Sequence, residues 1–266
     1  MKQPRGAHEL WNSFYASCIQ IVQHMVPQMF LRSLRLPIFL ASRALSARPA
    51  SNMTVRDQPF DYFLVVDFEA TCSREKPPPH PQEIIEFPVL KVNGRSFQVE
   101  STFHQYVQPR VHRELSSFCT ELTGIIQDMV DEQPFLEEVL EVCQYLHRLR
   151  AYWYRCLWRF SIRPLADETT LLRRLPSQCS YFKIPVPEYL TRWINLKKAF
   201  VEATGHWPKT LPETLEYCRL EHVGRHHSGI DDCHNIASIL RWLAEKGHIF
   251  RITGHLPSRC EYFLHY

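Results

Sequence analysis

Two carboxylates, Asp67 and Glu69, stand two residues apart directly after the apolar run from Tyr62 to Val66. Side chains alternate between the two faces of a β-strand, so acids at this spacing point to the same side. Two like charges at the end of a buried strand are costly unless a cation lies between them. Carboxylate oxygens are preferred ligands of Mg²⁺, so the pair predicts a divalent metal site. Taken alone, the pair also fits an exposed strand end with two solvated acids.

A histidine and an aspartate form a second candidate group in the segment from Gly224 to Leu240. Glycines mark its first part as a loop that holds His227, and a helix is expected to begin near Asp231. Asp231 suits the first turn, where free N–H groups and the helix dipole favour an acid. Asp232 shares a helical face with apolar residues at spacings of three and four, so it is expected to point toward the core and to need a partner there.

Together, these side chains could form the active site of a two-metal hydrolase. Asp67, Glu69 and Asp232 would supply carboxylate ligands. An imidazole with a pKa near 6.5 can accept a proton from an attacking water, and His227 would supply it.

The run from Tyr62 to Val66 is short and rich in β-branched and aromatic residues, which predicts a buried strand. Two further strands are expected at Ile84 to Lys91 and at Ser96 to Val107. They flank Asn93-Gly94, a strong hairpin signal. The sheet should therefore begin with three consecutive antiparallel strands, with the carboxylates on the first.

Helices are expected at Leu115 to Ile126, at Asp131 to Leu146 and at Leu211 to Cys218. The second of these carries apolar residues spaced for one face, after a candidate N-cap and a proline. Strands followed by helices favour an α/β or α+β layered fold.

The segment from His147 to Arg174 mixes arginines with aromatic residues. Such a mixture can stack on bases and hold phosphates. It also fits an amphipathic element whose arginine stems cover apolar surface. The residue pattern leaves both interpretations open.

The composition is that of a globular protein with a substantial core, since 45% of the 266 residues are hydrophobic and 22% are charged. A formal net charge of +3 is compatible with a polyanionic partner but does not require one. Nine scattered cysteines without a Cys-x-x-Cys pair suggest neither a zinc module nor a disulfide framework. A reducing, intracellular compartment is expected, in the cytoplasm or nucleus.

The N-terminal segment, residues 1–57, differs from the rest because no acidic residue lies between Glu9 and Asp57. Arginines spread through an acid-free, serine-bearing segment fit a mitochondrial targeting peptide, and they fit a disordered tail equally well. Its apolar part is too short and too mixed to cross a bilayer, so no transmembrane segment is expected.

Five sequence blocks resemble the DEDDh class of 3′–5′ exonucleases and, within it, the enhanced-RNAi exoribonuclease family. The blocks occur in the family's order, at Asp67–Cys72, His80–Pro88, Thr120–Ile125, Trp193–Lys198 and Gly224–Asp232. The resemblance covers about residues 60 to 252. It suggests an exonuclease domain at 58–252, preceded by the tail and followed by a C-terminal tail at 253–266.

The resemblance implies an RNase H-like α/β fold, with a mixed central sheet flanked by helices. It also implies hydrolysis of single-stranded RNA from the 3′ end with two Mg²⁺ or Mn²⁺ ions. Asp67, Glu69 and Asp232 match the metal-ligand positions, and His227 matches the general base. Ala70 would lie beside the terminal nucleotide. Lys197 and Lys198 are candidate phosphate contacts, although they also fit a solvated helix face.

The chain departs from the family at its third motif, which normally supplies another metal-ligating Asp shortly before a Leu-Pro pair. Thr170 stands at that position here, and Asp167 and Glu168 are shifted from it by two or three residues. Asp167 is a candidate metal ligand in its place. A shift of one residue on a strand turns a side chain to the other face, so neither acid can be assumed to substitute. The departure motivates an alternative hypothesis, a catalytically impaired pseudo-exonuclease that binds RNA or a protein partner.

Overall fold

The computed structural model describes residues 55–144, 162–166 and 170–257. Most of the predicted N-terminal tail, residues 1–54, lies outside this range, as does most of the arginine- and aromatic-rich segment. In the described part of the chain, no helix combines the length and apolarity needed to cross a bilayer.

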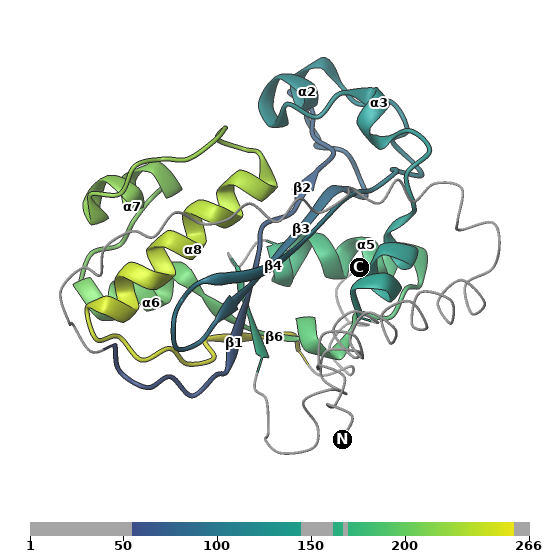
Figure 1. Cartoon of the computed structure of the whole chain (residues 1–266). Helices are drawn as coiled ribbons and strands as arrows, with labels where there is room; N and C mark the ends of the chain where they lie inside the picture. Colours follow the sequence, from purple (N-terminus) through teal and green to yellow (C-terminus); the bar gives the residue numbers. More distant parts are fainter. Residues whose placement is uncertain (1–54, 145–161, 167–169, 258–266) are drawn as a thin grey trace, which may run out of the picture. The chain divides into compact units, whose positions relative to one another are not determined.

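The sheet begins with the antiparallel strands predicted from the sequence (Figure 1). Strand β1 (Tyr62–Val66) pairs with β3 (Ile84–Asn93), and β3 pairs with β4 (Val99–Tyr106), both antiparallel. A short strand, β2 (Glu69–Ala70), also pairs with β3. The prediction of an antiparallel three-strand start is confirmed, and the two candidate carboxylates lie where β1 passes into β2.

Parallel pairing extends the sheet on the other side of β1. Strand β5 (Ile162–Ala166) runs parallel to β1, and β6 (Arg192–Asn195) runs parallel to β5. Strand β7 (Gly254–His255) closes this side, antiparallel to β6, so the sheet continues beyond residue 252. The result is a mixed seven-stranded sheet.

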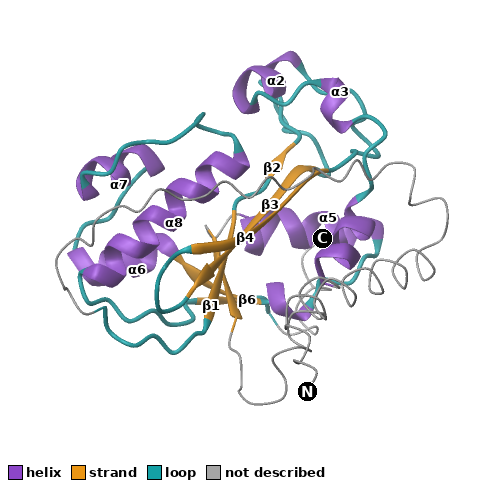
Figure 2. Ribbon diagram, viewed as in Figure 1, coloured by secondary structure: helices purple, strands orange, loops and turns teal. Residues whose placement is uncertain are grey.

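Helices flank the sheet (Figure 2). Helices α6 (Leu196–Thr204), α7 (Leu211–Cys218) and α8 (Gly229–Glu245) gather on one side, and α5 (Leu175–Phe182) lies on the other. Helices α2 (Ser117–Thr123) and α3 (Gln127–Val130) lie beyond the end of β2. The other helical segments among the described residues are residues 136–144, the π-helix η2 (Thr170–Arg174) and the 3₁₀-helix η3 (Glu188–Leu190).

Alternation along β1 divides the core between the two sides of the sheet. Phe63 and Val65 pack in a cluster with residues of α6, α7 and α8. Leu64, Val66 and Phe68 pack in a second cluster with residues of α5. Continuing the alternation sends Asp67 and Glu69 toward the side of α8, which is how the sheet brings them to the residues of that helix.

The β3–β4 hairpin is as predicted, but its connection is longer than a two-residue turn. The Asn93 Oδ1 accepts hydrogen bonds from the N–H groups of Arg95 and Ser96, at 2.9 and 3.0 Å. Phe97 then adopts a left-handed conformation, with φ of 53°, before β4 begins at Val99. The asparagine side chain thus organises a local turn of its own, which delays the start of the second strand.

Three predicted helices begin elsewhere than expected, and α2 is one of them, since it begins at Ser117 rather than Leu115. The helix expected from Asp131 begins at residue 136, because the Glu138 carboxylate accepts a hydrogen bond from the Phe135 N–H at 2.8 Å and caps the chain there. Helix α8 begins at Gly229, two residues before Asp231. Helix α7 has the predicted bounds. Helix α2 ends at Thr123, before the predicted Ile126, because Gly124 follows as the C-cap with a φ of 79°.

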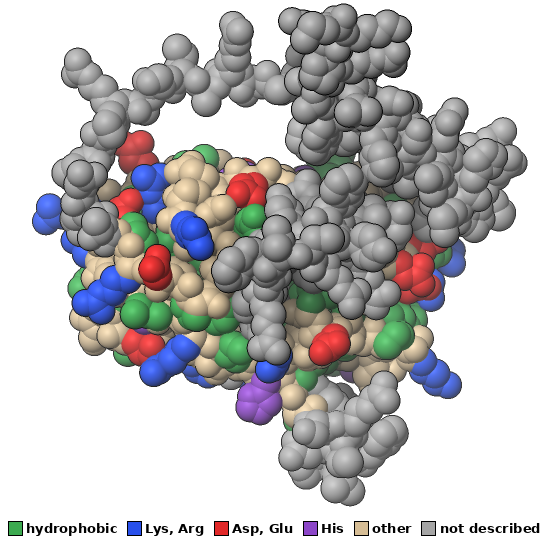
Figure 3. All heavy atoms as spheres, turned by 60° about the horizontal axis from the view of Figure 1, so that its bottom comes forward, with side chains coloured by type: hydrophobic (Ala, Val, Ile, Leu, Met, Phe, Trp, Pro, Cys, Tyr) green, Lys and Arg blue, Asp and Glu red, His purple; other side chains and the backbone are tan. Residues whose placement is uncertain are grey.

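On the face shown in Figure 3, basic and acidic side chains are interspersed over the described surface. No broad field of one charge covers the described residues on this face, in keeping with the small net charge. Recognition of a polyanion would therefore depend on local groups rather than on the general field of the protein.

Candidate active site

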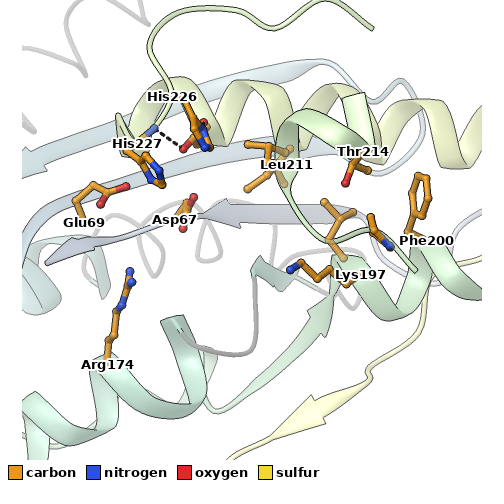
Figure 4. A pocket seen from close by; sticks show the side chains of 13 residues that line it. Asp67, Glu69, Arg174, Lys197, Phe200, Leu211, Thr214, His226 and His227 are labelled. Atoms are coloured by element: carbon orange, nitrogen blue, oxygen red, sulfur yellow. Dashed lines mark hydrogen bonds and ion pairs between the residues drawn. The ribbon is translucent and has the colours of Figure 1, made fainter. Parts of the chain in front are cut away.

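The four predicted metal-ligand and general-base residues line a single pocket (Figure 4). Asp67 follows β1, Glu69 lies on β2, Asp232 lies in the first turn of α8, and His227 lies in the loop before that helix. Arg174, at the end of η2, extends toward them from the α5 side of the pocket. Residues more than 150 positions apart in the chain thus meet at one place.

Asp232 is buried, with only 3% of its surface exposed. Its Oδ2 accepts a hydrogen bond from the backbone N–H of His227 at 3.0 Å. Its Oδ1 is also buried and accepts no hydrogen bond from the described residues. An unsatisfied buried carboxylate oxygen costs free energy, so this atom is poised to bind a cation.

Glu69 is buried beside Asp67, and its pKa is raised to about 9, first by burial and then by repulsion from the Asp67 carboxylate. The Arg174 guanidinium acts in the opposite direction. A divalent ion between the carboxylates would stabilise their charged forms. The carboxylates of Glu69 and Asp232 belong to a group, together with His227, whose ligand atoms lie within 4.8 Å of one another, so these two acids could bind one such ion.

The loop that carries His227 is held at several points. Asn235 on α8 accepts from the Val223 N–H and donates to the Val223 carbonyl, both at 2.9 Å. The Arg225 backbone N–H donates to Asp231 at 2.9 Å, and the Arg225 guanidinium donates to the carbonyl of Glu121 at 2.5 Å. These contacts position a residue whose own φ is 64°, a left-handed conformation uncommon outside glycine.

The His227 imidazole is suited to accept a proton at neutral pH. Burial lowers its pKa below 6.5, and the neighbouring His226 lowers it further, while the Asp232 carboxylate acts in the opposite direction. The ring is therefore neutral at pH 7, the form that a general base requires.

Glu86, which sequence reasoning did not single out, connects the sheet to α8. This residue of β3 is 1% exposed, and its carboxylate accepts hydrogen bonds from the N–H groups of Gly229 and Ile230 at 2.9 and 3.2 Å. It also lies 2.8 Å from His104 Nε2. A carboxylate at a helix N-terminus is favoured by the free N–H groups and the dipole. An acid within an apolar strand was the available signal.

Glu86→Gln should lower the free energy of unfolding by about 2–3 kcal/mol, because charge-assisted hydrogen bonds to the start of α8 are lost. Urea unfolding measures this change. Glu100→Gln is the control, since Glu100 is a partly exposed partner of Lys91 and its loss should cost less than about 0.5 kcal/mol. Equal stability of the two variants would show that Glu86 does not cap α8.

The predicted substrate-binding residues fall at different places. Lys197 lines the pocket, and its Nζ donates to the Lys209 carbonyl at 3.0 Å. Lys198 is not among the lining residues, and its backbone N–H donates to Asn195 Oδ1, the N-cap of α6. Ala70 is 5% exposed within β2 and also lies outside the pocket lining. Of these three residues, the structure brings only Lys197 into the pocket.

The third-motif region differs from the rest of the site. Asp167 and Glu168 lie outside the described residues, and Thr170 begins the π-helix η2. Arg174 follows four residues later, and its guanidinium donates to the Phe68 carbonyl at 2.9 Å. It partly offsets the negative charge of the pocket. No motif singled out this arginine, although it belongs to the arginine- and aromatic-rich segment from His147 to Arg174.

A family model described as Exonuclease, RNase_T, matches residues 64–240. The chain belongs to the RNase_T exonuclease family. Human ERI1 exoribonuclease 3 and this chain are 48% identical over 224 residues. The alignment covers 81% of this chain and 63% of that protein. The chain thus spans less than two thirds of the length of that relative.

Two solved structures extend the comparison to the fold. The nuclease domain of 3′hExo, a DEDDh family member bound to rAMP, aligns with a TM-score of 0.70 at 33% identity, covering 75% of this chain and 100% of that one. A 3′-exonuclease in 3′-end-specific recognition of a histone mRNA stem-loop aligns with a TM-score of 0.70 at 32% identity, covering 76% and 89%. The predicted exonuclease family and RNase H-like fold are confirmed. DEDDh exonucleases generally use divalent metal ions.

Proposed function

We propose that this chain is a metal-dependent 3′–5′ exoribonuclease that shortens single-stranded RNA from its 3′ end. The observation that carries the proposal is the convergence of Asp67, Glu69, Asp232 and His227 in one pocket. The relatives supply the reaction class, because they are named as exoribonucleases and one is described in recognition of an RNA 3′ end.

Asp67, Glu69 and Asp232 would hold two Mg²⁺ or Mn²⁺ ions. When bound, the ions would supply stabilisation of the negative charge that develops at the phosphate. Oxygen ligands alone favour Mg²⁺ and Mn²⁺ over softer metals. The buried, unsatisfied Oδ1 of Asp232 and the raised pKa of Glu69 both support a site built to receive positive charge.

His227 would accept the proton of the attacking water. Its backbone N–H is fixed by Asp232, so the base and a metal ligand are held together by one hydrogen bond. Lys197 would stabilise the RNA backbone from the α6 side of the pocket. Arg174 would contribute a further positive group beside the carboxylates.

A gel assay with 5′-labelled single-stranded RNA tests the proposal. In Mg²⁺, the native chain should produce a ladder that shortens from the 3′ end, and excess EDTA should abolish it. Glu69→Gln should give no ladder, whereas Glu216→Gln, at an exposed position on α7, should behave as the native chain. A DNA oligonucleotide of the same sequence measures the preference for RNA.

The same assay distinguishes the alternative hypothesis. A pseudo-exonuclease would bind the labelled RNA, more weakly as salt is raised, and would leave its length unchanged. The specific observation that favours this alternative is Thr170 at the position of the missing ligand. Bound but undegraded RNA would overturn the proposed activity.

A further inference from the structure

Two histidines face the unsatisfied oxygen of Asp232. His226 Nδ1 lies 3.5 Å from Asp232 Oδ1, and His222 Nε2 lies 3.9 Å from it. Ligand atoms of the three residues all lie within 4.8 Å of one another. This group is separate from the pair formed by Asp232 Oδ2 and the His227 backbone. The two oxygens of one carboxylate therefore serve two sets of neighbours.

The donor set favours a different metal from the one expected at the catalytic centre. Imidazole nitrogens suit Zn²⁺ and related transition metals, whereas Mg²⁺ prefers oxygen ligands. Two ligand atoms on one tetrahedral Zn²⁺ are roughly 3.3 Å apart, as follows from the usual metal–ligand lengths. The two nitrogen–oxygen separations, 3.5 and 3.9 Å, exceed this value only slightly, and the two histidine nitrogens lie within 4.8 Å of each other, so rotations of the histidine side chains would close the site around an ion.

Access to this group is open on the histidine side and closed on the carboxylate side. The side chains of His222 and His226 are 29% and 41% exposed, whereas that of Asp232 is 4% exposed. An ion could reach the imidazoles from solvent and find a buried oxygen that accepts no hydrogen bond from the described residues. A solvent molecule can complete a three-ligand zinc site.

We propose that His222, His226 and Asp232 form a Zn²⁺ site that shares Asp232 with the catalytic centre. Zn²⁺ bound there would take Asp232 Oδ1, an oxygen needed by the catalytic ions. Occupancy of the site would therefore inhibit the nuclease. The binding site stands on its own geometry, and the inhibition rests on the function proposed above.

Isothermal titration calorimetry of the full chain with ZnCl₂, in the presence of excess Mg²⁺, tests the site directly. His222→Ala and His226→Ala should each weaken one Zn²⁺-binding event at least about 10-fold, because each removes a ligand. His234→Ala is the matched control, since His234 is an exposed histidine on α8 outside this group, and it should titrate as the native chain. Zn²⁺ that binds elsewhere on the chain contributes equally to the titrations of the native chain, the variants and the control, so it does not affect the comparison.

Two further variants guard against loss of the fold. His222→Gln and His226→Gln keep a polar side chain of similar length, and circular dichroism verifies that each is folded. If the folded His222 and His226 variants give the same Zn²⁺ titration curves as the native chain, the proposed site is overturned. The two histidines would then only pair with Asp232.

The RNA assay separates this inference from the proposed function. If the proposed function holds, Zn²⁺ should inhibit RNA shortening in the presence of Mg²⁺. Inhibition of each histidine variant is measured relative to that variant's own rate without Zn²⁺. Half inhibition of each variant should need at least about 10-fold more Zn²⁺ than half inhibition of the native chain. Ligand-dependent Zn²⁺ binding without any RNA shortening would sustain the site and overturn the nuclease. If RNA is shortened but Zn²⁺ binding is the same in both histidine variants as in the native chain, the proposed nuclease function would stand and the Zn²⁺ site would be overturned.

Discussion

Asp67→Asn should reduce the rate of RNA shortening in Mg²⁺ by at least about 10³-fold. The substitution keeps the shape of the side chain but removes the charge of a metal ligand, and charge stabilisation by metal ions contributes several kcal/mol to such reactions. Each 1.36 kcal/mol corresponds to a tenfold change in rate. Single-turnover rate constants on 5′-labelled RNA, measured over a range of Mg²⁺ concentrations, give the size of the loss.

Asp128→Asn is the matched control for this loss. Asp128 is an exposed aspartate on α3 and does not line the active-site pocket, so its substitution should leave the rate within about twofold. A rate for Asp67→Asn as high as that of the control would show that Asp67 holds no catalytic ion.

His227→Ala should lower kcat by roughly 10²–10⁴-fold, the usual contribution of a general base. The pH profile provides a second readout. Because the pKa of His227 lies below 6.5, the active neutral form persists at neutral pH, and the native rate should fall only as pH drops through that lowered value. The variant should lose this acid limb, because it has no imidazole left to protonate at that position.

Comparison with His234→Ala separates the role of the base from a general effect of histidine removal. That exposed residue of α8 should change neither kcat nor the pH profile. An unchanged acid limb in His227→Ala would mean that another group accepts the proton.

The local sequence pattern was sufficient to predict the bounds of an element where the element carries its own start and stop signals. The strand Tyr62–Val66 and the helix Leu211–Cys218 have the predicted bounds. The helix is fixed by Thr210, whose hydroxyl accepts from the Glu213 N–H at 3.3 Å, and it is followed by Arg219 in a left-handed conformation. All of these determinants lie within a few residues of the element they bound.

The local sequence pattern was insufficient to predict the structure where residues distant in the chain determine it. Helix α8 begins earlier than expected because Glu86, more than 140 positions away in the chain, satisfies its first N–H groups. Gly229 permits this approach, since a Cβ there would lie 2.6 Å from the Asp67 carbonyl and 3.0 Å from the Glu86 carboxylate. Periodicity placed Asp232 toward the core, but it could not reveal the histidines that face its second oxygen.

The site residues themselves were found by type and spacing, whereas their supports were not. Arg174 and Glu86 contact the site through a backbone carbonyl and a helix end. The sequence marks Glu86 only as an acid within an apolar strand, which does not identify its partner. The predicted roles of Asp67, Glu69, Asp232 and His227 are supported by their convergence in one pocket.

The hydrogen bond from the Arg225 guanidinium to the Glu121 carbonyl affects how the loop of His227 can move. It ties the loop of His227 to the last turn of α2, where Gly124 leaves room for the guanidinium. Segments joined in this way tend to open and close as one cooperative unit. Fraying of α2 would therefore remove one of the contacts that hold the loop and leave those to α8. The lifetime of the positioned histidine would then depend in part on a seven-residue helix that carries none of the predicted catalytic groups.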